Sequence, residues 1–250
     1  MIENNLFLPL LITFIAGIST GIGSLIPIFF KKFNRKFLIF SLGLSAGVMI
    51  YISFAELLPE AIEDIGFTNA NIAFFIGVGF MMLLDFLIPH KFIAEEHLVE
   101  NKKIKRAGLF TALGIAIHNF PEGIAVFMSA LIDIELGIAL AIAIALHNIP
   151  EGIAISAPIY YSTKSKKKAF WYSFLSGIAQ PFGAIIAAIF LINYITPVIL
   201  AYTLAFVAGI MVFISFDELL PISFKGSEDH LSVFGLFIGM LIMAITLIFI

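Results

Sequence analysis

The sequence is dominated by apolar runs that are each long enough to cross a membrane. A transmembrane helix needs about 20 such residues to span about 30 Å of hydrocarbon. Hydrophobic residues make up 61% of the chain and charged residues 12%, a balance that no soluble domain of this length tolerates on its surface. We predict a single transmembrane domain, 1–250, of all-α polytopic class with eight transmembrane helices near 6–30, 37–62, 70–90, 107–132, 136–161, 168–193, 197–223 and 231–250.

The basic residues occur on only one set of the loops between these stretches. All 14 follow the first, third, fifth or seventh stretch: Lys31, Lys32, Arg35, Lys36, Lys91, Lys102, Lys103, Lys105, Arg106, Lys164, Lys166, Lys167, Lys168 and Lys225. The positive-inside rule predicts that these loops are cytoplasmic and that both termini are extracytoplasmic, in a multi-pass protein of the cell (inner or plasma) membrane. The N-terminal residues lack the basic segment of a signal peptide, so we expect the first stretch to be retained.

The opposite loops carry only acidic residues, namely Glu3, Glu63, Asp64, Asp133 and Glu135. Each one alone is most simply a solvated helix end. Together they would concentrate cations at the outer mouth of the protein.

One connection is long, the predicted cytoplasmic loop at about 91–106. It contains Glu95, Glu96, His97 and Glu100, and His90 lies just before it. The loop is either a metal-handling segment or a charged, flexible linker. Two His among mixed charges fall short of a His-rich tract, which favours the linker.

A short polar motif, H-N-x-P-E-G, occurs twice in the middle of apolar stretches, at 118–123 and 147–152. In a helix, residues four apart share a face, so His118 and Glu122 point to one side, as do His147 and Glu151. The proline of each motif cannot donate a backbone hydrogen bond and loosens the helix beside the polar cluster. One copy could be a kink with a mutually satisfied His and Glu. Two copies indicate a function, because ionisable groups inside a membrane are costly.

A second repeat relates distant parts of the chain. Residues 42–59 align without gaps to residues 204–221, and both contain I-S-F-x-E-L-L-P. The predicted helices run in opposite directions, so the copies are inverted. This predicts a 3+2+3 arrangement, with inverted repeats of helices 1–3 and 6–8 around a central helix 4/5 pair and a substrate site near the midplane. The glycines at 17, 21, 23, 177 and 183 are most simply small-residue packing surfaces.

Both motifs lie at the midpoints of their apolar stretches, which places them near the centre of the membrane. Because the two helices are antiparallel, His118 should lie level with Glu151, and Glu122 with His147. Neutral imidazole and carboxylate together suit zinc first, with iron, manganese, cobalt, nickel and cadmium as other candidates. The chain has no Cys, which removes thiolate sites. A proton relay or a structural lock is the alternative for the same groups.

The paired motifs, the eight predicted helices, the basic loop after the third and the 3+2+3 parse resemble the ZIP family of zinc- and iron-regulated transporters, particularly its bacterial broad-range zinc importers. The resemblance implies metal import through a central site that can be binuclear. It makes the four His and Glu side chains first-site ligands and implies that Asn119 and Asn148, with the two glutamates, face a second site. The family usually has Glu before a helix 6 proline, where this chain has Gln180.

Five further acidic residues lie along a candidate pathway: Glu56 and Glu60 toward the outer end of helix 2, Asp217 and Glu218 toward the inner end of helix 7, and Asp85 near the inner end of helix 3. Pseudo-symmetry pairs Glu56 at an entrance with Glu218 at an exit. The alternative is that these are helix-end carboxylates that reach interfacial water.

We therefore predict a non-enzymatic divalent metal transporter. Zn²⁺ is its transported substrate, the bilayer and divalent metals are its partners, and it has no organic cofactor and no nucleic acid partner. A homodimer is left open. The competing class is a membrane-embedded zinc-dependent hydrolase, which needs an asymmetric site and a separate general base. Two near-identical half-sites and the lack of H-E-x-x-H disfavour it.

Overall fold

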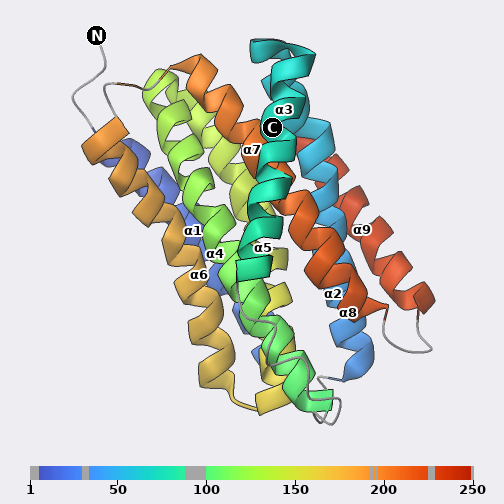
Figure 1. The fold of residues 1–250 in the computed structure, drawn as a ribbon. Helices are drawn as coiled ribbons and strands as arrows, with labels where there is room; N and C mark the ends of the chain where they lie inside the picture. Colours follow the sequence, from blue (N-terminus) through green and yellow to red (C-terminus); the bar gives the residue numbers. More distant parts are fainter. Residues whose placement is uncertain are drawn as a thin grey trace.

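The computed structural model of the protein is all-helical, with no strand, across the residues that it describes, which are 6–29, 34–87, 100–191, 194, 196–224 and 229–248. The long helices pack side by side as one bundle (Figure 1). In chain order the elements are α1 (Phe7–Phe29), α2 (Arg35–Ile52), the π-helix η1 (Ser53–Leu57), α3 (Leu58–Leu87), α4 (Glu100–Ile132), α5 (Ile134–Thr163), α6 (Lys166–Ile186), the π-helix η3 (Ala187–Leu191), α7 (Pro197–Ile214), the π-helix η5 (Ser215–Leu219), α8 (Leu220–Ser223) and α9 (Asp229–Ile248).

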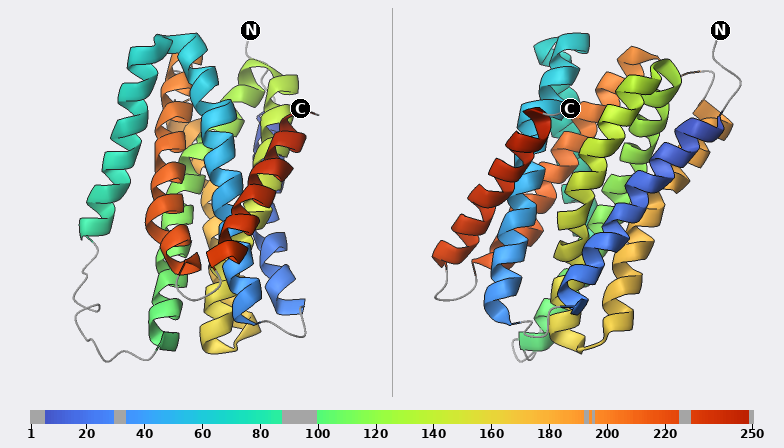
Figure 2. Two further views of the ribbon diagram at one scale, coloured as in Figure 1. Left: turned by 90° about the vertical axis from the view of Figure 1, so that its right-hand side faces the viewer. Right: turned by 180° about the vertical axis from the view of Figure 1, so that it is seen from behind.

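By length and composition, 7 helical segments within the described ranges can cross a membrane. One of them, Arg35–Phe86, is 52 residues long, which at 1.5 Å per residue is about 78 Å, more than twice the hydrocarbon thickness. Gly66 interrupts this segment with φ 79° and ψ 156°, a conformation that glycine adopts without a Cβ clash. The chain folds back within α3 (Figure 2). A single residue makes the turn, and the loop predicted between 62 and 70 is otherwise helical.

The predicted end of the long cytoplasmic loop is wrong. The loop was predicted to extend to residue 106, but α4 already begins at Glu100. The segment 100–106 is rich in Lys and Arg, which are good helix formers, so its charge does not prevent a helix. His90, Glu95, Glu96 and His97 lie outside the described residues, and the metal-handling interpretation of the loop stays a prediction.

Local capping residues explain where several helices begin. The side chain of Asn34 accepts a hydrogen bond from the backbone N–H of Phe37 at 3.0 Å. Asp133 accepts from the N–H groups of Glu135 and Leu136. Such side chains satisfy N–H groups that have no partner in the first turn. Ser165 and Thr196 cap α6 and α7 in the same way.

The helices pack most closely within two groups. In one group α1 packs on α5 and α6, and α4 packs on α5 and α6; in the other, α2 packs on α9 and α3 packs on α7. Glycines bring the backbones together within each group. A Cβ at Gly17 would lie 2.7 Å from the carbonyl oxygen of Gly177, and one at Gly239 would lie 2.1 Å from that of Leu44. This confirms the predicted small-residue surfaces on the first and sixth helices and adds others on α2, α3, α7 and α9.

Replacing Gly239 by Ala should destabilise the bundle, because the new methyl group would push α9 away from the Leu44 carbonyl of α2. Overpacking of this kind costs about 1–3 kcal/mol. Gly79→Ala is the matched control, since no atom beyond its chain neighbours and its own helix backbone lies within 4 Å of its Cβ position. We expect thermal unfolding of the detergent-purified protein to show a lower midpoint for Gly239→Ala only. Equal midpoints for the two variants would contradict the close packing.

Charge separates to the two ends of the bundle. α2 and α4 begin, and α5 gives way to α6, at one end, whereas the α4–α5 junction and the turn of α3 lie at the other (Figure 2). The described basic residues belong to the first end, and the acids at 63, 64, 133 and 135 belong to the second. The predicted segregation of charge is therefore present in the fold.

Candidate metal centre

Each H-N-x-P-E-G motif lies inside a continuous helix. α4 passes through Pro121 and α5 through Pro150 without ending. Each proline removes the backbone hydrogen bond to the carbonyl four residues earlier, that of Ile117 in α4 and of Leu146 in α5. The Ser45 hydroxyl of α2 donates to the carbonyl oxygen of Pro150 at 2.6 Å. The motif prolines therefore leave the helices intact, and the side chains keep their helical spacing.

Four ionisable side chains meet at the contact between α4 and α5. His118 Nε2 lies 2.9 Å from Glu151 Oε1, and His147 Nε2 lies 3.1 Å from Glu122 Oε1. Within α4, His118 Nε2 and Glu122 Oε1 are 3.4 Å apart. All four side chains are buried, none more than 2% exposed. The predicted cross-pairing of each His with the Glu of the other motif is confirmed.

The geometry of this cluster suits a metal ion. One ligand atom each from His118, His147 and Glu151 lies within 4.8 Å of the others, so the three atoms are close enough to converge on one ion, with small adjustments to reach the roughly 2.0–2.2 Å typical of zinc. Glu122 Oε1 adjoins both imidazoles and could supply a fourth ligand. The Oε2 atoms of both glutamates are buried without a hydrogen-bond partner among the described residues, so they are further oxygen donors. Two carboxylates would balance the charge of a dication.

The amide side chains predicted for a second site lie one helical step away and are also buried. Asn119 Nδ2 donates to the carbonyl oxygen of Ser176 at 3.0 Å. Asn148 Nδ2 donates to the carbonyl of Ala16 at 3.0 Å and to Gln180 Oε1 at 2.8 Å. The Oδ1 atoms of both Asn have no hydrogen-bond partner in the described part of the chain. Gln180 therefore faces the second motif.

The surroundings of the two motifs are related by symmetry. A Cβ at Gly183 of α6 would lie 2.1 Å from the carbonyl oxygen of Phe120, and one at Gly23 of α1 would lie 2.0 Å from that of Ile149. Phe120 and Ile149 hold the same position in the two motifs. α6 thus packs on α4 as α1 packs on α5, and the carbonyls of Ser176 and Ala16 receive the equivalent Asn side chains.

The predicted pathway acids divide into two places. Asp85, Asp217 and Glu218 each bring a carboxylate oxygen within 4.8 Å of the other two. Glu218 and Asp85 also line a small cavity that reaches Gly114 and Ile117 of α4, one residue before His118. Glu56 lies in η1 and Glu60 at the start of α3, both half-buried and separated by one helical turn. The three acids at 85, 217 and 218 are brought together, and Glu56 and Glu60 form a separate pair.

Residues that support the centre through backbone contacts were not predicted. Ser45 contacts Pro150 as described above, and the Ser173 hydroxyl donates to the carbonyls of Thr20 and Gly152 at 3.1 and 3.3 Å. Serines commonly hydrogen-bond a carbonyl of their own helix, so nothing in the sequence distinguished these two. The packing partners of α5 were needed to find them.

The fold and the centre define a polytopic helical membrane protein with a buried cluster of His and Glu side chains that could hold a metal ion. Residues 90–247 match the model of the family described as ZIP Zinc transporter. The chain is 50% identical to the zinc transporter ZupT of Chlorobium phaeovibrioides over 98% of both chains. It is 49% identical to the zinc transporter ZupT of Akkermansia muciniphila, over 95% of this chain and 96% of that one. The zinc transporter ZupT of Clostridium perfringens is 48% identical, over 98% of this chain and 96% of its own. The chain belongs to the ZIP family.

Proposed function

We propose that the protein imports zinc into the cytoplasm, with iron, manganese, cobalt and cadmium as further candidate substrates. The observation that carries this proposal is the buried cluster of two imidazoles and two carboxylates, cross-paired at 2.9 and 3.1 Å between α4 and α5. Relatives that match nearly the whole chain are zinc transporters. A dication in this cluster would be charge-balanced, which a low-dielectric site requires.

The proposed first site consists of His118, Glu122, His147 and Glu151. Asn119 and Asn148 are proposed to face a second position, together with the two glutamates and Gln180. The buried amide oxygens of both Asn, which have no hydrogen-bond partner among the described residues, support this assignment. The two positions would then share the glutamates, so the occupancy of one affects the charge at the other.

We propose that the chain crosses the membrane eight times as a 3+2+3 inverted repeat, with both termini outside. What supports this is that α2 packs on α9 as α7 packs on α3, and that α1 packs on α5 as α6 packs on α4. The π-helices η1 and η5 also fall on the same five positions of the two repeats. The basic end of the bundle would face the cytoplasm, and the acidic end would draw cations from outside.

Glu56 and Glu60 are proposed as the outer part of the pathway and Asp85, Asp217 and Glu218 as its inner part. The small cavity lined by Asp85, Glu218 and Ile117 of α4, the residue before His118, supports the second assignment. An ion leaving the central site would then meet carboxylates before reaching the cytoplasm.

The alternative function, a membrane-embedded zinc-dependent hydrolase, is not supported. The two halves of the centre are nearly identical, whereas a hydrolase needs one open coordination position and a separate general base. The family and its named relatives are transporters.

We expect zinc uptake to be driven by the membrane potential without nucleotide. Moving a dication inward across 100 mV, inside negative, is favourable by about 4.6 kcal/mol, twice the single-charge value. The measurement is zinc entry into proteoliposomes whose potential is set by valinomycin and a potassium gradient, with no ATP present. Uptake should rise as the interior becomes more negative.

Protein-free vesicles at the same potentials control for leakage, and Glu151→Gln vesicles control for transport through the site. An absence of uptake at every imposed potential, from a protein shown to bind zinc, would count against potential-driven import. An absence of both binding and uptake would count against the proposed function itself.

A further inference from the structure

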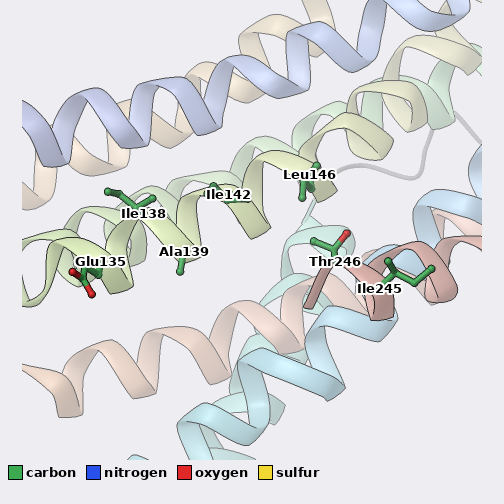
Figure 3. A pocket seen from close by; sticks show the side chains of 7 residues that line it. All are labelled: Glu135, Ile138, Ala139, Ile142, Leu146, Ile245 and Thr246. Atoms are coloured by element: carbon green, nitrogen blue, oxygen red, sulfur yellow. The ribbon is translucent and has the colours of Figure 1, made fainter. Parts of the chain in front are cut away.

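A groove of about 470 Å³ lies between α5 and α9 on the lipid-facing side of the bundle. Its size falls within the roughly 300–1,000 Å³ of ligand pockets. Figure 3 shows Glu135 at one end of the row of residues on α5 and Leu146 at the other, with Ile245 and Thr246 of α9 nearer Leu146. Ile138, Ala139 and Ile142 complete the lining. The groove is thus apolar along its length, with one carboxylate at its end.

The length of the groove matches one leaflet of a bilayer. Glu135 lies in the first turn of α5, and Leu146 follows it by three helical turns, which is about 16 Å of helix. Half of the hydrocarbon core is about 15 Å. The groove therefore runs from the membrane surface to the midplane, where Leu146 adjoins His147.

The two ends of the groove have different chemistry. At the deep end, the Thr246 hydroxyl donates to the carbonyl of Ile242 at 3.0 Å, so it needs no polar partner from a ligand. At the shallow end, Glu135 is exposed. The neighbouring acid, Asp133, already caps α5 through Oδ1. The free carboxylate at the mouth is that of Glu135, and it faces the side of the membrane opposite the basic residues.

We propose that this groove binds one phospholipid with a primary-ammonium headgroup, of the phosphatidylethanolamine type, with an acyl chain along α5 and the ammonium at Glu135. A carboxylate favours an ammonium and disfavours the net negative charge of phosphatidylglycerol. A primary ammonium also donates hydrogen bonds to the carboxylate. A quaternary ammonium, as in phosphatidylcholine, is recognised mainly by aromatic rings, and the 7 described residues that line the groove include no aromatic ring.

A second copy of the chain fits this surface less well. A stable interface takes about 20–30 residues from each partner, and this concave surface offers the 7 that line it. The groove instead lies between two helices that contact each other sparsely. A lipid there would pack directly beside the helix that carries His147.

The test is retention of lipid by the purified, full-length protein, read by native mass spectrometry with phosphatidylethanolamine, phosphatidylcholine and phosphatidylglycerol of identical acyl chains in equal amounts. We expect the wild type to retain phosphatidylethanolamine about tenfold more than either competitor, equivalent to about 1.4 kcal/mol. Glu135→Gln should reduce this preference to parity. Asp133→Asn is the matched control, because it removes one charge at the same end while Asn still caps the helix, and it should keep the preference.

Ala139→Phe provides an independent variant, because the ring would fill the groove without changing its charge. It should lower retention of all three lipids together. Equal retention of the three lipids by the wild type, or equal loss in Glu135→Gln and Asp133→Asn, would overturn the proposal. Because the chain has no Cys, Ile142→Cys adds a unique thiol in the groove. Disulfide-linked dimers through that thiol in vesicles would also overturn it, by showing a second copy at this surface.

Discussion

Replacing His118 by Ala should lower zinc uptake at limiting zinc by at least about a hundredfold while leaving the protein in the membrane. The substitution removes the partner that Glu151 Oε1 contacts at 2.9 Å and leaves that buried carboxylate unpaired. Losing only the hydrogen-bonding partner of a metal ligand costs about 10–100-fold in metal affinity, and losing a ligand itself should cost at least as much. A dication would then have one fewer ligand in a low-dielectric site. The measurement is initial uptake of radioactive zinc at concentrations below the wild-type half-saturation point.

Two variants make this result specific. His230→Ala removes an exposed imidazole at the start of α9 and should transport like the wild type. Glu151→Gln keeps the shape of the side chain but removes its charge, and it should lose uptake about as severely as His118→Ala. Normal uptake by both His118→Ala and Glu151→Gln, at equal protein levels in the membrane, would refute the proposed centre.

The meeting of the four ionisable side chains was predictable from the sequence because it depends only on the lengths of two apolar stretches, the antiparallel direction of their helices and the helical spacing of the motif residues. Two apolar stretches of similar length place their midpoints at the same depth, and antiparallel helices bring His118 level with Glu151 and Glu122 level with His147. Helical spacing then sets the faces. The structure adds the distances and shows that burial is complete. Binding of a metal by these groups remains a prediction.

The π-helices η1 and η5 were not predictable, although the sequence repeat that contains them was found from the sequence. In both copies a leucine before proline donates its N–H five residues back, Leu58 to Ser53 and Leu220 to Ser215. A proline clashes with the preceding turn, and widening the helix by one residue is one way to relieve that clash. Periodicity could not reveal it, because these helices are apolar on nearly every side.

The packing partners of the helices also required the structure. Glycines in the first and sixth stretches indicated close contacts, but not with which helix. Between membrane helices there is no hydrophobic driving force to select a partner from the sequence pattern. The structure places α1 on α5 and α6 on α4, and only then do the Ala16 and Ser176 carbonyls become neighbours of the motif asparagines.

Replacing Gln180 by Glu should raise the number of tightly bound metal ions from one toward two. Gln180 is fully buried and accepts a hydrogen bond from Asn148 Nδ2 at 2.8 Å, so its side chain faces the second position. Glu122 and Glu151 balance one dication, but a second dication would leave two positive charges uncompensated in a poorly solvated site. A neutral amide cannot offset them. The wild type should therefore hold one metal tightly and any second ion weakly.

The substitution is nearly isosteric and keeps an oxygen that can accept from Asn148, so the fold should tolerate it. It adds an oxygen ligand and a negative charge, which favours harder ions such as ferrous iron and manganese relative to zinc. Metal content of the purified proteins gives the stoichiometry, and competition between iron and zinc uptake gives the selectivity. Gln180→Met, similar in size but without the oxygen or the charge, is the control and should remain at one metal.

Two outcomes would show that the second position is built from other groups. The first is two equally tight ions in the wild type, because the amide would then be no obstacle to a second dication. The second is unchanged stoichiometry and selectivity in Gln180→Glu, because a carboxylate adjoining Asn148 would then lie outside the reach of the ion. In either case the charge needed to hold two dications would have to come from elsewhere than α6, and the described groups nearest to the centre on α4 and α5 are the two glutamates already counted.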